Sequence, residues 1–146
     1  MIRMYLDNNI DKFPFYSQIR DNDCGFACLK MICSFYQIPF DKIDQQCKFP
    51  LSEKGLSVYD LLELLKLLGF NHFLTDTQCS PLLFKATLPC LMLWGGNHFI
   101  VIYEFRVDKL LIADPASGLE WIDAMTFYKH CQRTKGEWII LLEPKN

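Results

Sequence analysis

The fold of this chain must be built around an apolar helix that begins at a cysteine. Between Cys24 and about Gln37 the apolar residues cover more than one face, which predicts a helix enclosed by the core. Pro39 ends this helix, and the polar run from Gln18 to Asp23 precedes it as a loop. Unpaired N–H groups and the helix dipole lower the pKa of a thiol at a helix start, so Cys24 is a candidate nucleophile. It is also consistent with a small apolar core residue, which is what most free cysteines are.

A nearby base, and a group that orients it, would favour the nucleophile. His98 opens an apolar run typical of a strand, and Asp114 ends the next such run. If these two strands are antiparallel neighbours, Asp114 lies beside His98. The other histidines lack such a partner in the sequence. His72 is predicted to lie at the surface, and His130 to be a cation near the end of a helix.

The remaining pattern predicts helices in the first half of the chain and strands in the second. Ser57 and Asp60 resemble a capping box that starts a second helix, which Gly69 ends. Strands are predicted at 73–75, 88–94, 99–105, 107–113 and 138–142, with a short one at 119–122, and further helices at 41–47 and 123–131. Helices followed by strands indicate an α+β fold, with a helical N-terminal half packed on an antiparallel β-sheet.

Composition excludes several classes of protein. The 146 residues are enough for one domain, and 51% are hydrophobic, as in a globular protein. A net charge of −2 without a long basic run argues against a nucleic-acid partner. No stretch approaches the roughly 20 apolar residues that span a bilayer. The seven cysteines include no CxxC pair, so reduced thiols are expected. A metal site that uses Cys24, Cys28 and a histidine has no familiar spacing.

Two acidic residues stand close to the candidate nucleophile. Asp21 and Asp23 come just before Cys24, where negative charge would raise the pKa of the thiol. They are predicted to cap the helix or to face solvent. The pair Gly95-Gly96 is interpreted as an ordinary loop between two strands.

Separate motifs, in a particular order, resemble one known family. The amide of Gln18, six positions before Cys24, is a candidate donor to an oxyanion. The pattern Gln-x5-Cys-Gly-x-Ala-Cys-Leu-x-Met-Ile, then His-Phe-x-Val-Ile from His98, then Asp-Pro at Asp114, resembles the C39 peptidases. These are papain-like cysteine proteases, found mostly at the N-terminus of bacterial ABC exporters. The likeness runs along nearly the whole chain.

The resemblance implies a function and a set of roles. Cys24 would be the nucleophile, His98 the base, Asp114 the acid that orients it and Gln18 the oxyanion donor. The substrate would be an exported bacteriocin-like or other peptide, cut after a Gly-Gly motif, with its leader helix bound on an apolar surface. Residues 1–146 would form one peptidase domain at the N-terminus of an ABC exporter, on the cytoplasmic side of the inner membrane. Its partners would be the exporter's membrane and ATPase domains, and no cofactor or metal would be needed.

Three other interpretations remain open at this point. A different papain-like enzyme, such as an amidase or an acyltransferase, would share the triad and differ in its substrate. A non-catalytic docking domain of an exporter would bind substrates without cleaving them, although such relatives usually lack the cysteine. A purely structural domain would contain only unreactive core cysteines.

Overall fold

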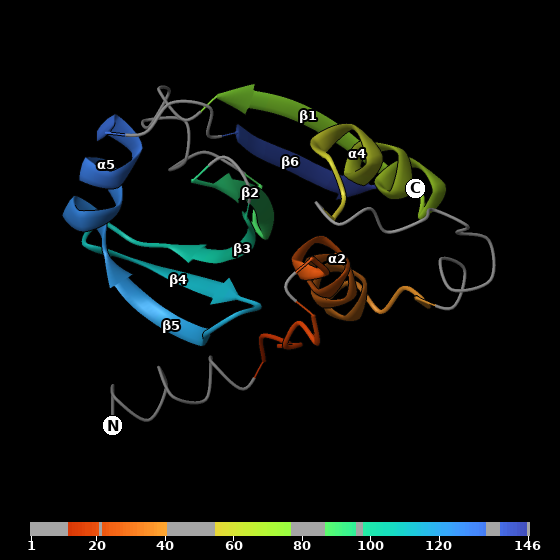
Figure 1. The fold of residues 1–146 in the computed structure, drawn as a ribbon, viewed down its shortest axis with the longest axis horizontal. Coiled ribbons are helices and arrows are strands. Elements are labelled where there is room, and N and C mark those ends of the chain that lie inside the picture. The colour runs from red at the N-terminus through yellow and green to blue at the C-terminus, as the bar shows by residue number, and fades with distance from the viewer. Residues whose placement is uncertain are drawn as a thin grey trace.

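The strands that the structure describes form one antiparallel sheet of six (Figure 1). This computed structural model describes residues 12–20, 22–40, 55–76, 87–95, 98–133 and 138–145. The strands lie side by side in the order β1-β6-β2-β3-β4-β5. In chain order they are β1 (Phe70–Asp76), β2 (Cys90–Trp94), β3 (His98–Phe105), β4 (Lys109–Asp114), β5 (Gly118–Asp123) and β6 (Trp138–Pro144). The last strand along the chain therefore pairs between two earlier ones, β1 and β2.

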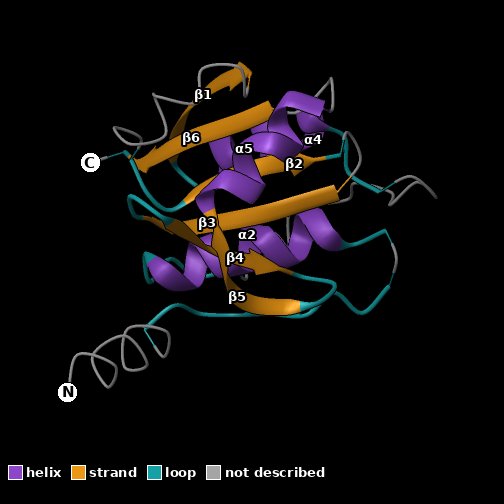
Figure 2. Cartoon of the chain, turned by 90° about the vertical axis from the view of Figure 1, so that its left-hand side faces the viewer, coloured by secondary structure: helices purple, strands orange, loops and turns teal. Residues whose placement is uncertain are grey.

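Helices cover both faces of this sheet, as Figures 1 and 2 show. Helices α2 (Cys24–Phe35) and α4 (Val58–Leu67) lie on one face, and α5 (Ala124–Arg133) lies on the other. Within the described chain, none of the helices is long and apolar enough to cross a membrane. The arrangement confirms the predicted α+β class, in which helices of the N-terminal half pack on an antiparallel sheet.

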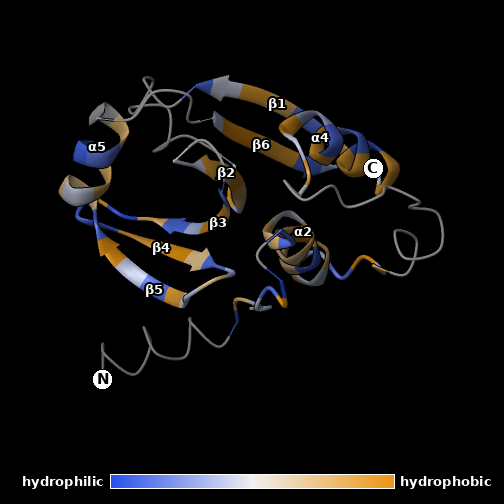
Figure 3. Cartoon of the chain, in the orientation of Figure 1, coloured by the Kyte–Doolittle hydropathy of each residue, from blue (hydrophilic) through white to orange (hydrophobic). Residues whose placement is uncertain are grey.

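Side chains that alternate along the strands fill two separate cores. Val101 of β3 packs with Leu29 of α2 in the larger core cluster, whereas its neighbour Ile100 packs with Phe127 of α5 in the other. Successive side chains of a strand point to opposite faces, so β3 contributes to both cores. Figure 3 shows that α4 and β6 are largely hydrophobic, as expected for elements that enclose a core.

Local hydrogen bonds explain where the helices begin and end. The hydroxyl of Ser57 accepts a hydrogen bond from the N–H of Asp60 at 3.0 Å, and the Asp60 carboxylate accepts one from the Ser57 N–H at 3.1 Å. This confirms the predicted capping box of α4, and Gly69 follows the helix with a φ of 92°. At the start of α5 the Asp123 carboxylate accepts a hydrogen bond from the N–H of Thr126 at 3.1 Å, as predicted.

Several predicted boundaries are shifted, each for a local reason. The strand predicted to start at Val107 starts at Lys109, because a turn closed by the Arg106 N–H and the Lys109 carbonyl at 2.8 Å occupies the first positions. The strand predicted at 73–75 is longer, because Phe70–Asp76 pairs with β6 along its whole length. The helix predicted to reach Gln37 ends at Phe35. The helix predicted at 41–47 lies outside the described residues.

The segment before the loop of Gln18 is anchored to both α2 and β3. The ring of Phe13 lies 6.4 Å from that of Phe35 and 4.9 Å from that of Tyr103, measured between centroids. The hydroxyl of Tyr103 donates a hydrogen bond to the carbonyl of Pro14. The loop that leads into α2 therefore starts from a fixed point on the core.

Two glycines with positive φ provide a test of the packing beside this loop. A Cβ at Gly55 (φ 77°) would lie 2.5 Å from the carbonyl oxygen of Asn22, whereas one at Gly69 (φ 92°) would meet no atom within 4 Å among the described residues. Gly69→Ala should lower the free energy of unfolding by about 1–2 kcal/mol, through its backbone strain alone. Gly55→Ala should lower it further, because the Asn22 carbonyl must also move. Equal losses in chemical denaturation would contradict this close approach.

Candidate active site

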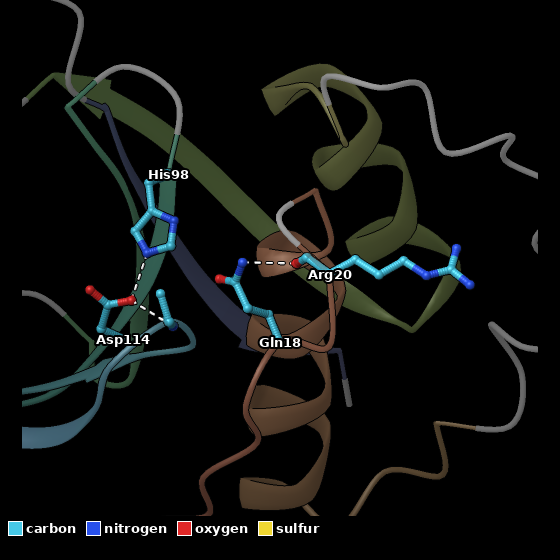
Figure 4. A network of polar contacts seen from close by, with 5 residues as sticks. Gln18, Arg20, His98 and Asp114 are labelled. Carbon is cyan, nitrogen blue, oxygen red and sulfur yellow. Dashed lines mark hydrogen bonds and ion pairs between the residues drawn. The ribbon is translucent and has the colours of Figure 1, made fainter.

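A histidine and a carboxylate meet where two neighbouring strands lie side by side. His98 is the first residue of β3, Asp114 is the last residue of β4, and the two strands are antiparallel. The Nε2 atom of His98 lies 2.6 Å from Oδ1 of Asp114, and the two side chains are 25% and 26% exposed (Figure 4). Oδ1 also accepts a hydrogen bond from the N–H of Ala116 at 2.9 Å. The antiparallel pairing thus brings Asp114 beside His98, as the sequence predicts.

The thiol of Cys24 lies against the same histidine. Cys24 is the first residue of α2 and only 7% exposed, and it lies close enough to His98 for the imidazole to lower the pKa of its thiol. Since Nε2 of His98 is engaged by Asp114, the ring nitrogen that remains for the thiol is Nδ1. The imidazole therefore lies between a sulfur and a carboxylate.

This contact favours charge separation between the thiol and the imidazole. Burial raises the pKa of Cys24, but hydrogen bonds with His98 and with the backbone of Phe99 lower it, and the net pKa is below the ordinary 9.0. The hydrogen bond with Cys24, together with that to Asp114, raises the pKa of His98 from 6.5 to about 9, although burial acts in the opposite direction. Both shifts favour the ion pair of a thiolate and an imidazolium over the neutral pair.

The loop before α2 brings Gln18 close to this pair. The backbone N–H of Gln18 donates to the carbonyl of Pro115 at 2.9 Å, which ties the loop to the turn after Asp114. Its side-chain Nε2 donates to the carbonyl of Arg20 at 2.8 Å (Figure 4). A side-chain amide has two N–H groups, so one remains for another acceptor. Gln18 Oε1 is buried and has no hydrogen-bond partner among the described residues.

Asp23 does not cap the helix, contrary to one of the two roles predicted for it. It occupies the N-cap position of α2, but its side chain makes no capping hydrogen bond. Its carboxylate instead accepts hydrogen bonds from the backbone N–H groups of Ile19 at 3.2 Å and of Arg20 at 3.1 Å. Among the described residues it is not one of the groups that shift the pKa of Cys24. Asp21 lies outside the part of the chain that the structure describes.

The other described cysteines are chemically unlike Cys24. None of the five described cysteines forms a disulfide, and all five are buried. Burial raises the pKa of Cys28 well above 9.0, and it raises the pKa of Cys33 and of Cys90 to about 12. Within the described chain, no group of three or more His, Cys, Asp or Glu side chains could hold a metal ion. The remaining cysteines, Cys47 and Cys79, lie outside the described residues.

The two remaining histidines lie elsewhere in the fold. His72 is half-buried on β1, and the strands β6 and β2 separate β1 from β3. It is therefore less exposed than the surface position predicted for it. The ring of His130 stacks on that of Trp94, with centroids 3.8 Å apart and planes 7° apart. Its position near the end of α5 agrees with the sequence, but the stacking was not foreseen.

Sequence reasoning missed the contacts that hold the loop in place. No sequence motif predicts the hydrogen bond from the Gln18 N–H to the Pro115 carbonyl, because it joins residues far apart in the chain. The one available signal was Asp23 itself, since aspartate commonly accepts hydrogen bonds from nearby backbone N–H groups in turns.

Comparisons with a family model and with individual relatives point to the same protein family. A model described as the Peptidase C39 family matches residues 12–145. The chain is 29% identical over 111 residues to the colicin V secretion/processing ATP-binding protein CvaB of Escherichia coli, with 76% of this chain and 16% of the relative covered. It is 31% identical over 114 residues to the sublancin-168-processing and transport ATP-binding protein SunT of Bacillus subtilis (strain 168), which covers 74% of this chain and 16% of the relative. The chain thus spans only a small part of these relatives.

Solved structures share the fold. A double glycine motif protease from an AMS/PCAT transporter, crystallised in complex with the leader peptide, has a TM-score of 0.75 and 25% identity, and the match covers 90% of this chain and 91% of that one. The peptidase domain of Streptococcus ComA, a bifunctional ABC transporter, has a TM-score of 0.71 and 23% identity, with 91% and 99% covered. These likenesses confirm the predicted papain-like arrangement of helices on an antiparallel sheet.

The contact between Cys24 and His98 predicts selective and pH-dependent alkylation. Iodoacetamide should label Cys24 first, and its rate should reach a plateau at a lower pH than that of an ordinary thiol, because the thiolate forms below 9.0. His98→Ala should slow labelling at neutral pH, because the largest effect that offsets burial of the thiol is then lost and its pKa rises. Peptide mapping across a pH series measures both effects. His72→Ala is the matched control and should leave the profile unchanged; faster labelling of Cys28 than of Cys24 would contradict the assignment.

Proposed function

Because the chain belongs to the Peptidase C39 family, we propose that it is a cysteine endopeptidase that removes leader peptides after a Gly-Gly motif. The observation that carries this proposal is the line of contacts from the Cys24 thiol through His98 to Asp114, whose final contact is 2.6 Å. A thiol of lowered pKa beside a cationic imidazole is the arrangement that nucleophilic catalysis by cysteine requires. A purely structural or docking domain would have no use for it.

The first chemical step is attack by the Cys24 thiolate on the carbonyl carbon of the glycine before the scissile bond. The carbonyl oxygen becomes an oxyanion, and hydrogen-bond donors must already be aimed at it to lower the barrier. We assign this role to the free N–H of the Gln18 amide and to the backbone N–H of Cys24. His98 holds a proton throughout this step, because its pKa is raised to about 9.

The next steps release the two products. The imidazolium of His98 gives its proton to the leaving amine, the C–N bond breaks, and the acyl group stays on Cys24 as a thioester. A water molecule, deprotonated by the now neutral His98, then attacks the thioester and restores the thiol. Asp114 acts through Nε2 of the imidazole, since its carboxylate fixes the ring orientation and stabilises the imidazolium. The reaction needs no metal or cofactor.

The setting of the reaction is proposed from the relatives. CvaB and SunT are named as secretion or transport proteins with processing and ATP-binding functions, and a related protease has been crystallised with a leader peptide. We therefore propose that residues 1–146 are one peptidase domain at the N-terminus of an ABC exporter, on the cytoplasmic side of the membrane. Its substrates would be bacteriocin-like or other exported peptides, and its partners the membrane and ATPase domains.

Substitutions of the four site residues should impair peptide cleavage in different ways. Cys24→Ala should abolish cleavage of a leader peptide that ends in Gly-Gly, yet leave its binding intact. His98→Ala should be nearly as severe, because the thiolate loses both its base and its counter-cation. Gln18→Ala should lower kcat by roughly 10²–10³-fold, with a smaller change in KM. Asp114→Asn should be milder than Cys24→Ala, because it removes no proton carrier.

The experiment measures kcat and KM for one synthetic leader-core peptide, with circular dichroism to verify folding of each variant. A panel of simple esters and amides run in parallel distinguishes this peptidase from a general amidase or acyltransferase. A folded Cys24→Ala variant that still cleaves would end the cysteine-peptidase proposal. An unchanged kcat in Gln18→Ala would remove only its role as an oxyanion donor.

Cleavage should fall at high pH where alkylation does not. Above a pH of about 9 the imidazole of His98 loses its proton, so it cannot protonate the leaving amine. The thiolate of Cys24 persists there and still reacts with iodoacetamide. Paired pH profiles of kcat/KM and of alkylation test this, and a cleavage rate that stays level through this range would argue against His98 as the acid.

A further inference from the structure

The backbone of Arg20 contacts two side chains of the loop before α2. Its carbonyl oxygen accepts the Nε2 hydrogen of Gln18 at 2.8 Å (Figure 4). Its N–H donates to Oδ1 of Asp23 at 3.1 Å. The second oxygen of the Asp23 carboxylate accepts the N–H of Ile19 at 3.2 Å. The backbone N–H of Asp23 also reaches the Arg20 carbonyl, at 3.4 Å. Asp23 therefore binds both peptide groups that flank the Cα of Arg20: its carboxylate accepts the Arg20 N–H, and its own N–H reaches the carbonyl to which the Gln18 amide is bound.

We propose that Asp23 is a positioning residue, which aims the Gln18 amide at the oxyanion by fixing the backbone on both sides of Arg20. The inference rests on the proposed peptidase function, because only acyl transfer requires an amide aimed at that point. A free glutamine side chain samples many rotamers, and a donor that must be ordered during the reaction stabilises the oxyanion less. With one N–H held by the Arg20 carbonyl, the other is left in a defined direction.

Among the described residues, packing in the core contributes little to holding this part of the loop. The side chain of Ile19 is 88% exposed and Arg20 is also exposed, so neither residue is anchored by packing in the core. The hydrogen bonds of the Asp23 carboxylate are charge-assisted, which makes them stronger than bonds between neutral groups. On the other side, Gln18 is bound through its backbone to Pro115 at 2.9 Å. The amide is thus fixed between the turn after Asp114 and Asp23.

Other roles for Asp23 agree less well with its contacts. Its side chain makes no capping hydrogen bond to α2, so helix capping does not explain its position. Among the described residues, the effects that shift the pKa of Cys24 are its burial, His98 and the backbones of Phe99 and Gly25, which do not include the Asp23 charge. The contacts that remain are those to the loop, and they lead directly to Gln18.

The test compares kcat and KM of Asp23→Ala and Asp23→Asn with those of the wild type, on the same Gly-Gly leader peptide. Asp23→Ala should lower kcat by up to about 10²-fold with little change in KM, because a small misplacement of a catalytic group is enough for such a loss. Asp23→Asn should recover part of it, since one amide oxygen can accept only one of the two bonds well. The alkylation profile of Cys24 should stay unchanged in both variants.

The matched control is Asp123→Ala. Asp123 also accepts a backbone N–H, at the start of α5, and it lies at the other end of β4 from Asp114. This variant should leave kcat unchanged, with circular dichroism to verify folding of all variants. An unchanged kcat in folded Asp23→Ala would overturn the proposal. A shifted alkylation profile would overturn it as well, because Asp23 would then act on the thiol.

A double-mutant cycle tests whether Asp23 acts through Gln18. In the Gln18→Ala background, adding Asp23→Ala should have no further effect on kcat, because the amide to be aimed is already gone. If the fold-loss of kcat in the double variant equals the product of the losses in the two single variants, the proposal is overturned, since Asp23 would then act independently of Gln18.

Hydrogen exchange separates this proposal from the proposed function. The amide protons of Ile19 and Arg20 should lose protection in Asp23→Ala, whereas those of α2 should keep it. Unchanged protection of both loop amides would overturn the role of Asp23, whatever the enzyme cleaves. A wild type that cleaves no Gly-Gly peptide would overturn the proposed function, and the exchange data alone would then decide whether Asp23 holds the loop.

Discussion

The end of strand β4 holds both sides of the candidate site in place. Asp114 binds the imidazole of His98 through Oδ1, and the next residue, Pro115, accepts the backbone N–H of Gln18. The N–H of Ala116 donates to the same Oδ1, which helps to fix the orientation of the carboxylate. Three consecutive residues thus position the imidazole of His98 and the loop of Gln18 relative to each other. A displacement of this turn would move both groups together rather than one at a time.

Partial burial makes the contact between Cys24 and His98 effective. A thiol that is 7% exposed loses most of its hydration, which by itself opposes ionisation. The same low exposure strengthens hydrogen bonds to the thiolate and its attraction to an imidazolium. Cys28, one turn further along α2, is buried without such a partner, and its pKa rises well above 9.0. Two cysteines of one helix therefore differ in chemistry because only one of them lies beside a histidine.

Much of this could be predicted from the sequence because it depends on local patterns. Apolar periodicity located α2, α4 and the strands, and the capping residues Ser57 and Asp123 marked two helix starts. The proximity of His98 and Asp114 followed from assuming that two successive strands are antiparallel. The loop contacts of Asp23 could not be predicted, because an aspartate before a helix can bond either forward to the helix or backward to the loop. The position of β6 between β1 and β2 could not be predicted from the sequence either, since strand order depends on packing between residues far apart in the chain.

The position of β6 has a consequence for how the molecule assembles during synthesis. In the described sheet β1 pairs only with β6, so the ladder between β1 and β2 stays incomplete until the last strand is inserted between them. The face that carries α2 and α4 depends on that insertion, because β1 and β6 supply Phe70 and Leu142 to its core. On a ribosome the N-terminal helices emerge long before β6 does. The helix that begins at Cys24 is therefore synthesised well before its scaffold, and the core around it is complete only after residues near 144 have left the exit tunnel.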